Sequence, residues 1–289
     1  MPELPEVETF RAVLEQELCG RAIESVDLRH PAIVGHPSPE AFVEGLNHRA
    51  IEAVGRRGKF LILHLAGESD LVCHLRMTGR LLVTPHAHPA WPHTHAVLHL
   101  SDGRQLRFAD QRRFGRLWLR RAGEIDTFTG IARLGPEPFE TAFDAAWLEE
   151  RLSGRQRAIK TCLLDQSLVA GIGNIYADEI LFAARLHPEQ PAASLTRAQI
   201  RRLAALIPAT LAKAVDDNRV TPEAFLQDGG TEYRNTPLLR IYGHEGDPCP
   251  RCHSALRRLT VGGRSSCHCP KCQRPQSENR PSRQRQSRA

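Results

Sequence analysis

Two pairs of cysteines near the C-terminal end restrict the possible fold more than any other feature of this sequence. Cys249 and Cys252 form one Cys-x-x-Cys pair, and Cys269 and Cys272 form another after sixteen intervening residues. Each pair brings two thiolates to one side of a tight turn, so two pairs at this separation can bind one tetrahedral zinc ion. All four ligands are cysteines, which leaves no coordination position open for catalysis. The spacing predicts one structural Zn²⁺ that holds a β-hairpin rigid.

The N-terminal segment and the remaining cysteines indicate in which cellular compartment the protein occurs. Charged side chains occupy the N-terminal segment where an export signal would have an apolar stretch, and no apolar run approaches the roughly 20 residues that cross a bilayer. The sequence therefore predicts a cytoplasmic protein with reduced thiols and no membrane partner. Cys267 is predicted to be a spare thiol, and three further cysteines are typical of small buried side chains: Cys19, Cys73 and Cys162.

Basic residues are concentrated at the C-terminal end. Residues 249–289 contain ten Lys and Arg and one acid, which gives +9, whereas the whole chain carries +6, so residues 1–248 sum to −3. Arginines between the two cysteine pairs, Arg257, Arg258 and Arg264, would face phosphate if the hairpin met a polyanion. A solvated tail would have a similar composition, so charge alone leaves both interpretations open.

The apolar pattern divides the chain into a β-rich part and a helical part. Residues 5–18 have helical spacing, and short apolar runs from about 50 to 120 predict an antiparallel sandwich or barrel. Ser101-Asp102-Gly103 indicates a hairpin turn. A mixed connector follows at 121–150. A later helix is predicted to begin at the N-cap Thr196 and to bury one face: Ile200, Leu203, Ile207, Leu211 and Val215.

Five motifs occur in order before the cysteine quartet: MPELPEVETF at 1–10, GRRGKF at 55–60, HLRMTG at 74–79, DQRRFG at 110–115 and GIGNIYADE at 171–179. Together they closely resemble the bacterial formamidopyrimidine-DNA glycosylase (8-oxoguanine DNA glycosylase) family. The resemblance implies an α+β multidomain fold: an N-terminal antiparallel β-sandwich with flanking helices, then a C-terminal helical domain with a helix–two-turn–helix element and a zinc-finger β-hairpin.

The resemblance also divides the chain into segments. The implied divisions are a catalytic β-sandwich domain at 1–131, a linker at 132–150, a helix–two-turn–helix domain with a lesion-capping loop at 151–236, a four-Cys zinc finger at 237–273 and a disordered basic tail at 274–289.

The family is a bifunctional glycosylase and AP lyase, and four catalytic residues are carried over by motif. Pro2 corresponds to the nucleophile, Glu3 to the general acid, Glu6 to a second carboxylate that assists elimination, and Lys59 to the catalytic lysine. An α-amine suits the first role because its reference pKa is near 8, against about 10.4 for lysine. Without the resemblance, the start of the chain reads as an ordinary acidic helix N-terminus and Lys59 as a solvated cation.

The implied DNA contacts fall into two groups. Asn174 and Arg264 correspond to residues that hold phosphates, and three further residues are expected to contact the backbone: His74, His93 and Tyr242. Met77, Arg112 and Phe114 correspond to the family's inserted triad, although base rates for Met and Phe by themselves favour ordinary core packing. Arg112 only donates hydrogen bonds, which suits the two acceptors of cytosine and favours guanine lesions.

Two positions depart from the commonest family pattern: Gln111 stands where proline is frequent, and Arg76 where glycine is frequent. The expected function is excision of oxidised purines from double-stranded DNA by a monomer, in base excision repair. Two alternatives stay open: an endonuclease VIII-like enzyme for oxidised pyrimidines, and a non-catalytic zinc-finger protein that binds damaged DNA.

Overall fold

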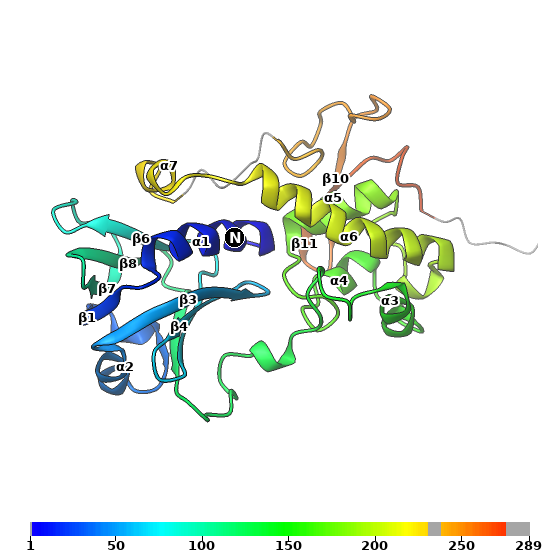
Figure 1. Cartoon of the computed structure of the whole chain (residues 1–289). Helices are drawn as coiled ribbons and strands as arrows, with labels where there is room; N and C mark the ends of the chain where they lie inside the picture. Colours follow the sequence, from blue (N-terminus) through cyan, green and yellow to red (C-terminus); the bar gives the residue numbers. More distant parts are fainter. Residues whose placement is uncertain (1, 231–237, 276–289) are drawn as a thin grey trace, which may run out of the picture.

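The computed structural model describes residues 2–230 and 238–275. Figure 1 shows a β-rich half and a helical half side by side, with helix α1 (Leu4–Leu18) beginning where they meet. Glu3 and Glu6 form a capping box at the start of this helix, and Pro5 occupies its first turn. Its apolar face, which includes Val7, Phe10 and Leu14, is buried in the core of the β-rich half. The predicted helix over 5–18 is confirmed.

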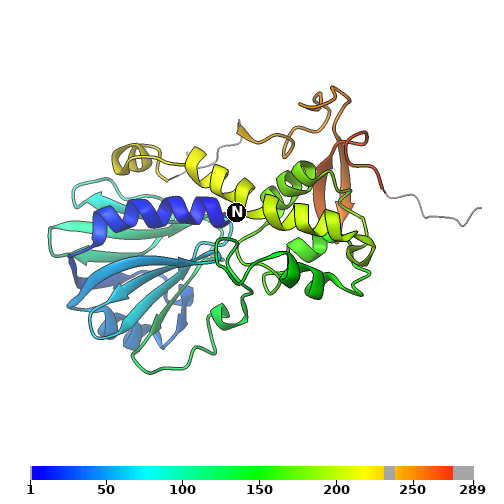
Figure 2. The ribbon, with the colours of Figure 1, turned by 45° about the vertical axis from the view of Figure 1, so that its right-hand side comes forward.

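Nine strands form the β-rich half: β1 (Ala22–Leu28), β2 (Val34–His36), β3 (Arg49–Arg57), β4 (Phe60–Leu65), β5 (Ser69–His74), β6 (Gly79–Pro85), β7 (Thr94–Leu100), β8 (Arg104–Asp110) and β9 (Arg116–Arg120). Their order is β2-β9-β5-β4-β3-β1-β7-β8-β6. Only two residue pairs join β3 to β1, at Ala22↔Ala50 and Ile23↔Arg49. One apolar core contains side chains from both sides of this weak junction, so the strands fold over each other as a sandwich (Figure 2).

Most neighbouring strands are antiparallel, and the turn predicted at 101–103 joins β7 to β8. The pairing of β2 with β9 is parallel, which the sequence analysis did not anticipate. It also omitted β1, β2, the 3₁₀ turn η1 (Pro31–Ile33) and helix α2 (Pro39–Leu46). These elements are short or carry many polar residues, so their apolar periodicity is weak.

The helical half consists of α3 (Ala145–Leu152), α4 (Ile159–Leu163), α5 (Asn174–Ala184) and α6 (Arg197–Asp217), with the short turn η3 (Ala192–Ser194). The turn η2 (Ile131–Arg133) lies in the connector before α3, and its Ile131 packs against Phe60 and Trp118 of the β-rich half. A second apolar core lies among these helices. Thr196 is the N-cap of α6, as predicted, and its side chain accepts a hydrogen bond from the backbone of Gln199. Helix α3 begins at Ala145, inside the segment predicted to be a linker.

Helix α7 (Pro222–Gln227) returns to the β-rich half after α6. Its Phe225 is buried in the N-terminal core and packs edge-on against Phe10, with ring centroids 4.9 Å apart. The segment assigned by sequence to the helical domain therefore contributes to the core of the other half.

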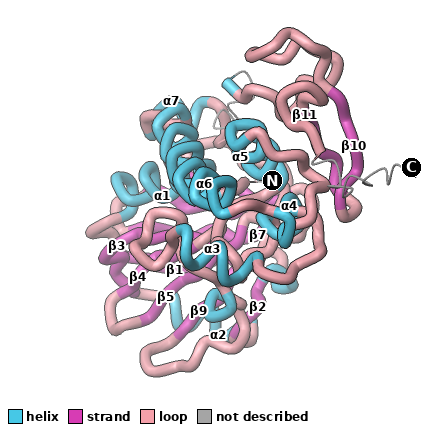
Figure 3. Tube along the Cα trace, turned by 90° about the vertical axis from the view of Figure 1, so that its right-hand side faces the viewer, coloured by secondary structure: helices cyan, strands magenta, loops and turns pink. Residues whose placement is uncertain are grey.

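The cysteine pairs flank a separate hairpin of β10 (Arg257–Val261) and β11 (Arg264–His268), which Figure 3 shows beside α5 and apart from the large sheet. A buried ion pair ties it to the helices: Lys160 Nζ donates to Asp178 Oδ1 at 2.8 Å and to the carbonyl of Ser265 at 2.8 Å. No helix among the described residues is long and apolar enough to span a membrane. Most of the lesion-capping loop expected around 229–235 and of the basic tail expected at 274–289 lies outside those residues.

Candidate active site

The side chain of Glu3 lies at the N-terminus of α5. Its carboxylate accepts backbone hydrogen bonds from Gly173 (2.7 Å), Ile175 (2.8 Å) and Tyr176 (3.2 Å), and the residue is 1% exposed. Free N–H groups and the helix dipole make this position favourable for an anion. The start of the chain is thereby fixed against a motif some 170 residues away.

Two glycines make this approach possible. A Cβ on Gly173 would lie closer than 3.0 Å to the Glu3 carboxyl group, and one on Gly171 would collide with Leu4. Gly171 also has a φ of +93° and accepts a hydrogen bond from the backbone of Leu4 through its carbonyl. The two glycines of the GIGN segment therefore allow the N-terminal segment to pack closely against the first turn of α5.

Glu6 is a second buried carboxyl group beside Glu3. Its two oxygens accept hydrogen bonds from the hydroxyl of Tyr176 (2.7 Å) and from the backbone N–H of Glu3 (2.7 Å). Burial first, and then the neighbouring charge of Glu3, raise the pKa of Glu6 to about 7, while the two hydrogen bonds oppose this shift. Glu6 can therefore exchange a proton near neutral pH, as general acid–base chemistry requires.

Lys59 follows a left-handed turn at Gly58, where β3 passes into β4. Its ammonium donates to the carbonyl of Ile172 at 2.8 Å, close to the glycines that hold Glu3. Burial lowers the pKa of Lys59, whereas the charges of Glu3 and Glu6 act in the opposite direction. The charges of both carboxylates therefore act on Lys59, and Pro2, which directly precedes Glu3, is buried.

Glu137 fixes the turn that precedes Lys59. Its carboxylate accepts hydrogen bonds from the backbone of Gly58 and from the guanidinium groups of Arg56 (2.8 Å) and Arg57 (3.3 Å). Glu137 lies in the segment predicted from sequence to be a mixed connector, 121–150. Its neighbours Gly135-Pro136 and Pro138 were the only local signal of an ordered turn.

A cavity of about 460 Å³ opens beside Lys59. Three other predicted DNA-contact residues line it: His74, Asn174 and Arg264. The side-chain oxygen of Asn174 is buried and has no hydrogen-bond partner among the residues that the structure describes. Burial, then the charges of Arg76 and Lys59, lower the pKa of His74 to about 3, so this imidazole is neutral at physiological pH. A neutral imidazole and several cations are suited to bind phosphate.

Met77, Arg112 and Phe114 lie together on two loops at the end of the sandwich. The Arg112 guanidinium lies 3.1 Å from Met77 Sδ and 4.7 Å from the centroid of the Phe114 ring. Met77 is 39% exposed and Phe114 49% exposed, so neither residue packs into the core. Two large apolar side chains at an exposed loop tip are suited to enter a base stack.

Asp110, which the sequence analysis did not single out, holds these two loops. Its carboxylate accepts hydrogen bonds from the hydroxyl of Thr78 and from the backbones of Arg112 (3.2 Å) and Gly115 (2.7 Å). Thr78 belongs to the loop of Met77, so a single buried carboxylate fixes both arms of the triad. The DQRRFG motif contained this aspartate, but only the fold shows that it points inward.

The remaining predicted contacts lie away from the cavity. His93 is exposed, has a φ of +63° and borders a separate hollow beside Gln111. Tyr242 is half-buried near β11, where its backbone donates to Glu179 at 2.9 Å. The four histidines of 85–95 form no metal-ligand group within the described part of the chain.

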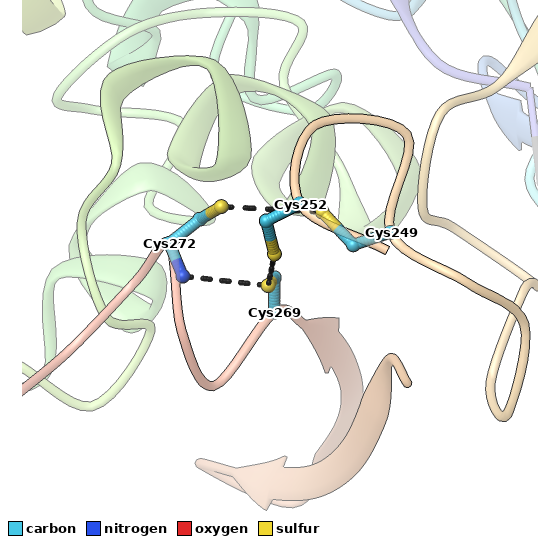
Figure 4. Close-up of side chains that lie close together, drawn as sticks. All are labelled: Cys249, Cys252, Cys269 and Cys272. Atoms are coloured by element: carbon cyan, nitrogen blue, oxygen red, sulfur yellow. Dashed lines mark hydrogen bonds between the residues drawn. The ribbon is translucent and has the colours of Figure 1, made fainter. Parts of the chain in front are cut away.

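The four predicted metal ligands converge, as Figure 4 shows. All four sulfur atoms lie within 4.8 Å of one another, with Cys252 Sγ 3.4 Å from Cys269 Sγ and Cys249 Sγ 4.0 Å from Cys272 Sγ. Tetrahedral ligands at about 2.3 Å from a zinc ion would lie about 3.8 Å apart. The quartet therefore fits one metal ion, and Cys267 is not part of it.

Comparison with known proteins identifies the family. The profile of the formamidopyrimidine-DNA glycosylase N-terminal domain matches residues 1–117, and that of the family's H2TH domain matches residues 134–224. A formamidopyrimidine-DNA glycosylase from Moorella thermoacetica is 48% identical over 259 residues, which cover 90% of this chain and 94% of that protein. The chain belongs to the formamidopyrimidine-DNA glycosylase family. It is accordingly an enzyme of base excision repair.

Other relatives and solved structures of this glycosylase belong to the same family. One from Geobacillus kaustophilus is 42% identical, covering 95% of this chain and all of that protein. The Lactococcus lactis Fpg (MutM) in complex with a Fapy-dG containing DNA has a TM-score of 0.84 and 34% identity, covering 94% of this chain and 100% of that chain. Its complex with an abasic site containing DNA has a TM-score of 0.83 and 32% identity, covering 94% and 99%. The predicted fold class is confirmed.

Proposed function

We propose that this glycosylase removes oxidised purines, including formamidopyrimidines and 8-oxoguanine, and then cleaves the DNA strand by β,δ-elimination, with Pro2 as the nucleophile. The observation that carries the proposal is the clamp between the start of the chain and α5. Three backbone N–H groups hold Glu3, the residue that directly follows Pro2. Such a clamp fixes the N-terminal amine close to the cation-lined cavity, as a positioned nucleophile requires.

The first step is a substitution at the sugar. The neutral secondary amine of Pro2, once Met1 is removed, donates its electron pair to C1′ of the damaged nucleotide, and the bond from C1′ to the base breaks with its electrons leaving on the base. The nitrogen, once bonded to C1′, loses its proton to the carboxylate of Glu3 in this proposal. Glu3 then delivers this proton to the ring oxygen O4′ as the C1′–O4′ bond opens, and the released base takes up a proton from water. The product is an iminium between Pro2 and C1′.

The iminium then accepts electrons during elimination. A base removes a proton from C2′, the electron pair forms a C2′–C3′ double bond, and the 3′ phosphate leaves. Glu6 suits the proton transfers because its pKa is raised to about 7, so both of its protonation states are populated near neutral pH. A second elimination releases the 5′ phosphate, and water hydrolyses the remaining adduct to regenerate the amine.

We further propose that Lys59, Asn174 and Arg264 bind the phosphates next to the lesion, with His74 as a neutral donor in the same cavity. Met77 and Phe114 enter the space left by the extruded base, and Arg112 pairs with the opposite cytosine. His93 and Tyr242 are proposed as more distant backbone contacts. In this scheme residues 1–131 carry the chemistry, both residues 1–131 and residues 151–273 contact DNA, and the enzyme acts on the bacterial chromosome in the cytoplasm.

The metal assigned to the cysteine quartet is zinc, in the same proposal. Four thiolates that can bind one ion in tetrahedral geometry suit Zn²⁺, which has no redox chemistry and accepts four sulfur ligands with no open coordination position. The residues that would hold it are Cys249, Cys252, Cys269 and Cys272. The ion would supply rigidity to the hairpin that carries Arg264, and no catalytic step involves it.

Borohydride trapping on a duplex with 8-oxoguanine opposite cytosine tests the mechanism. Reduction of the iminium should give a covalent complex, and mass spectrometry should find the cross-link on Pro2 in a chain that lacks Met1. A cross-link on Lys59 would overturn the assignment of the nucleophile. Tight lesion binding without any cross-link would favour the non-catalytic damage binder.

Oxidised pyrimidines form the second candidate substrate class. One solved complex of the Lactococcus lactis Fpg contains an oxidised pyrimidine containing DNA, at 33% identity to this chain. Comparing excision from duplexes with 8-oxoguanine opposite cytosine and thymine glycol opposite adenine separates the two classes. Much faster excision of the pyrimidine lesion would contradict the role proposed for Arg112.

A further inference from the structure

Arg76 occupies a backbone position that suits glycine. It lies in the turn between β5 and β6 with a φ of +55°, and its N–H donates to His74 Nδ1 at 3.0 Å. The left-handed conformation costs a residue with a Cβ about 1 kcal/mol or more. The side chain is exposed, and its guanidinium makes no hydrogen bond or ion pair within residues 2–230 and 238–275. No contact of the Arg76 guanidinium within these residues therefore stabilises the folded state.

The same side chain borders the cavity of Lys59. Among the described residues, four cations line that cavity: Lys59, Arg76, Arg157 and Arg264. The single carboxylate in this described lining, Asp165, already pairs with Arg155 at 3.4 Å. The charge of Arg76 is felt inside the cavity, because it contributes to the lowered pKa of His74. This excess of positive charge suits an anion that carries more than one negative group.

The position of Arg76 in the turn narrows the identity of that anion. It directly precedes Met77, which lies at the exposed loop tip with Arg112, whereas Lys59 and Asn174 lie on the cavity wall. Arg76 thus lines the cavity and also adjoins the loop tip, so a DNA strand that contacts both would pass near its side chain. Phosphates follow one another at every nucleotide along such a strand, so an additional cation on this path meets an additional phosphate.

We propose that Arg76 is an additional phosphate-binding residue, which contacts one phosphodiester of the lesion-containing strand between the cavity and the Met77 loop. This inference rests on the proposed function, because it requires that damaged DNA occupies the cavity. It makes Arg76 a determinant of DNA affinity and of its salt dependence, without a part in the bond-breaking steps.

The test measures binding to a duplex with a tetrahydrofuran abasic analogue over a series of KCl concentrations, so no chemistry is needed. Arg76→Gly should reduce the slope of log Kd against log salt by about 0.9, the value for one phosphate contact on duplex DNA. The ratio of the variant's Kd to the parent's Kd should then be about threefold smaller at 200 mM salt than at 50 mM salt. Arg76→Lys should restore most of the slope because it keeps the charge.

Arg185→Gly is the matched control. Arg185 is also an exposed arginine in the left-handed region, with a φ of +56°, but it caps the C-terminal end of α5 outside the cavity. Its slope should equal that of the parent. Equal slopes for Arg76→Gly and the parent, or equal losses in both glycine variants, would overturn the proposal. Arg76→Asn removes the charge but keeps a Cβ, so agreement between Asn and Gly excludes added backbone flexibility as the cause.

Neutral methylphosphonate substitutions, one phosphate at a time on the lesion strand, locate the contact. At one position the methylphosphonate should weaken binding by the parent but should not further weaken binding by Arg76→Gly, because the contact is already lost in the variant. If every methylphosphonate weakens binding by the parent and by Arg76→Gly to the same extent, the assignment is overturned. The proposed function is tested separately by borohydride trapping. Absence of a cross-link in the parent enzyme would contradict the proposed function, whatever the salt dependence of DNA binding is.

Discussion

The carboxylate of Glu3 accepts a hydrogen bond of 2.7 Å from the backbone N–H of Gly173, although 170 residues separate them in the chain. This contact joins the first helix of the β-rich half to the first turn of α5. It fixes the start of the chain at the place where the two halves meet, and the integrity of the site therefore depends on a residue that carries no reactive group.

Gly173→Ala should reduce excision of 8-oxoguanine by about 100-fold, because its Cβ would displace the Glu3 carboxyl group and a displacement of about 1 Å can have this effect. Single-turnover kinetics on the lesion duplex measures the loss. Gly45→Ala in α2 is the control, since its Cβ would collide with Leu119 far from the site. Equal activity in Gly173→Ala and the parent would show that Glu3 tolerates displacement.

Tyr176→Phe should raise the pKa of Glu6 above about 7, because the hydroxyl of Tyr176 stabilises the ionised carboxylate. Titration of the carboxyl carbon by NMR measures this directly, with Tyr242→Phe as the control that leaves Glu6 untouched. A downward shift would contradict the assigned hydrogen bond. In the parent, the pKa of Glu6 in the folded state is about 7, above the reference value of 4.5. Its contribution to the free energy of unfolding is therefore fully present below pH 4.5 and is lost as the pH rises through about 7.

Cys252→Ser should lose the single bound metal ion, measured as zinc per chain, and should bind DNA more weakly because the hairpin of β10 and β11 has little core of its own. Cys267→Ser is the matched control from the same hairpin: this thiol lies outside the quartet, so one zinc ion per chain should remain. Retention of zinc by Cys252→Ser would contradict the proposed ligand set.

Arg112→Ala should reduce the preference for cytosine opposite the lesion by roughly tenfold, since a guanidinium that pairs with a base contributes about 1–3 kcal/mol to discrimination. The measurement compares kcat/KM on 8-oxoguanine duplexes with cytosine and with adenine in the opposite strand. Arg113→Gly is the control, because Arg113 has a φ of +57° that glycine adopts readily. An unchanged preference in Arg112→Ala would remove the basis for its proposed role.

Several predictions from local pattern agree with the structure. The helix over Leu4–Leu18, the turn at 101–103, the N-cap at Thr196 and the convergence of four cysteines all depend on residues close in sequence. The missed elements β1, β2 and α2 carry weaker periodicity, and the parallel pairing of β2 with β9 joins segments about 80 residues apart. No spacing rule encodes such a pairing.

The sequence by itself determined the cysteine quartet, the main periodic elements and the family, because each is written in the identity and spacing of neighbouring residues. Only the tertiary structure decided which side chains meet across the chain. It placed Glu3 against Gly173, turned Glu137 toward Gly58, exposed Met77 and Phe114, and buried Phe225 beside Phe10. The physical reason is that burial and long-range hydrogen bonding depend on how whole elements pack, and the same residue types are compatible with either environment until that packing is known.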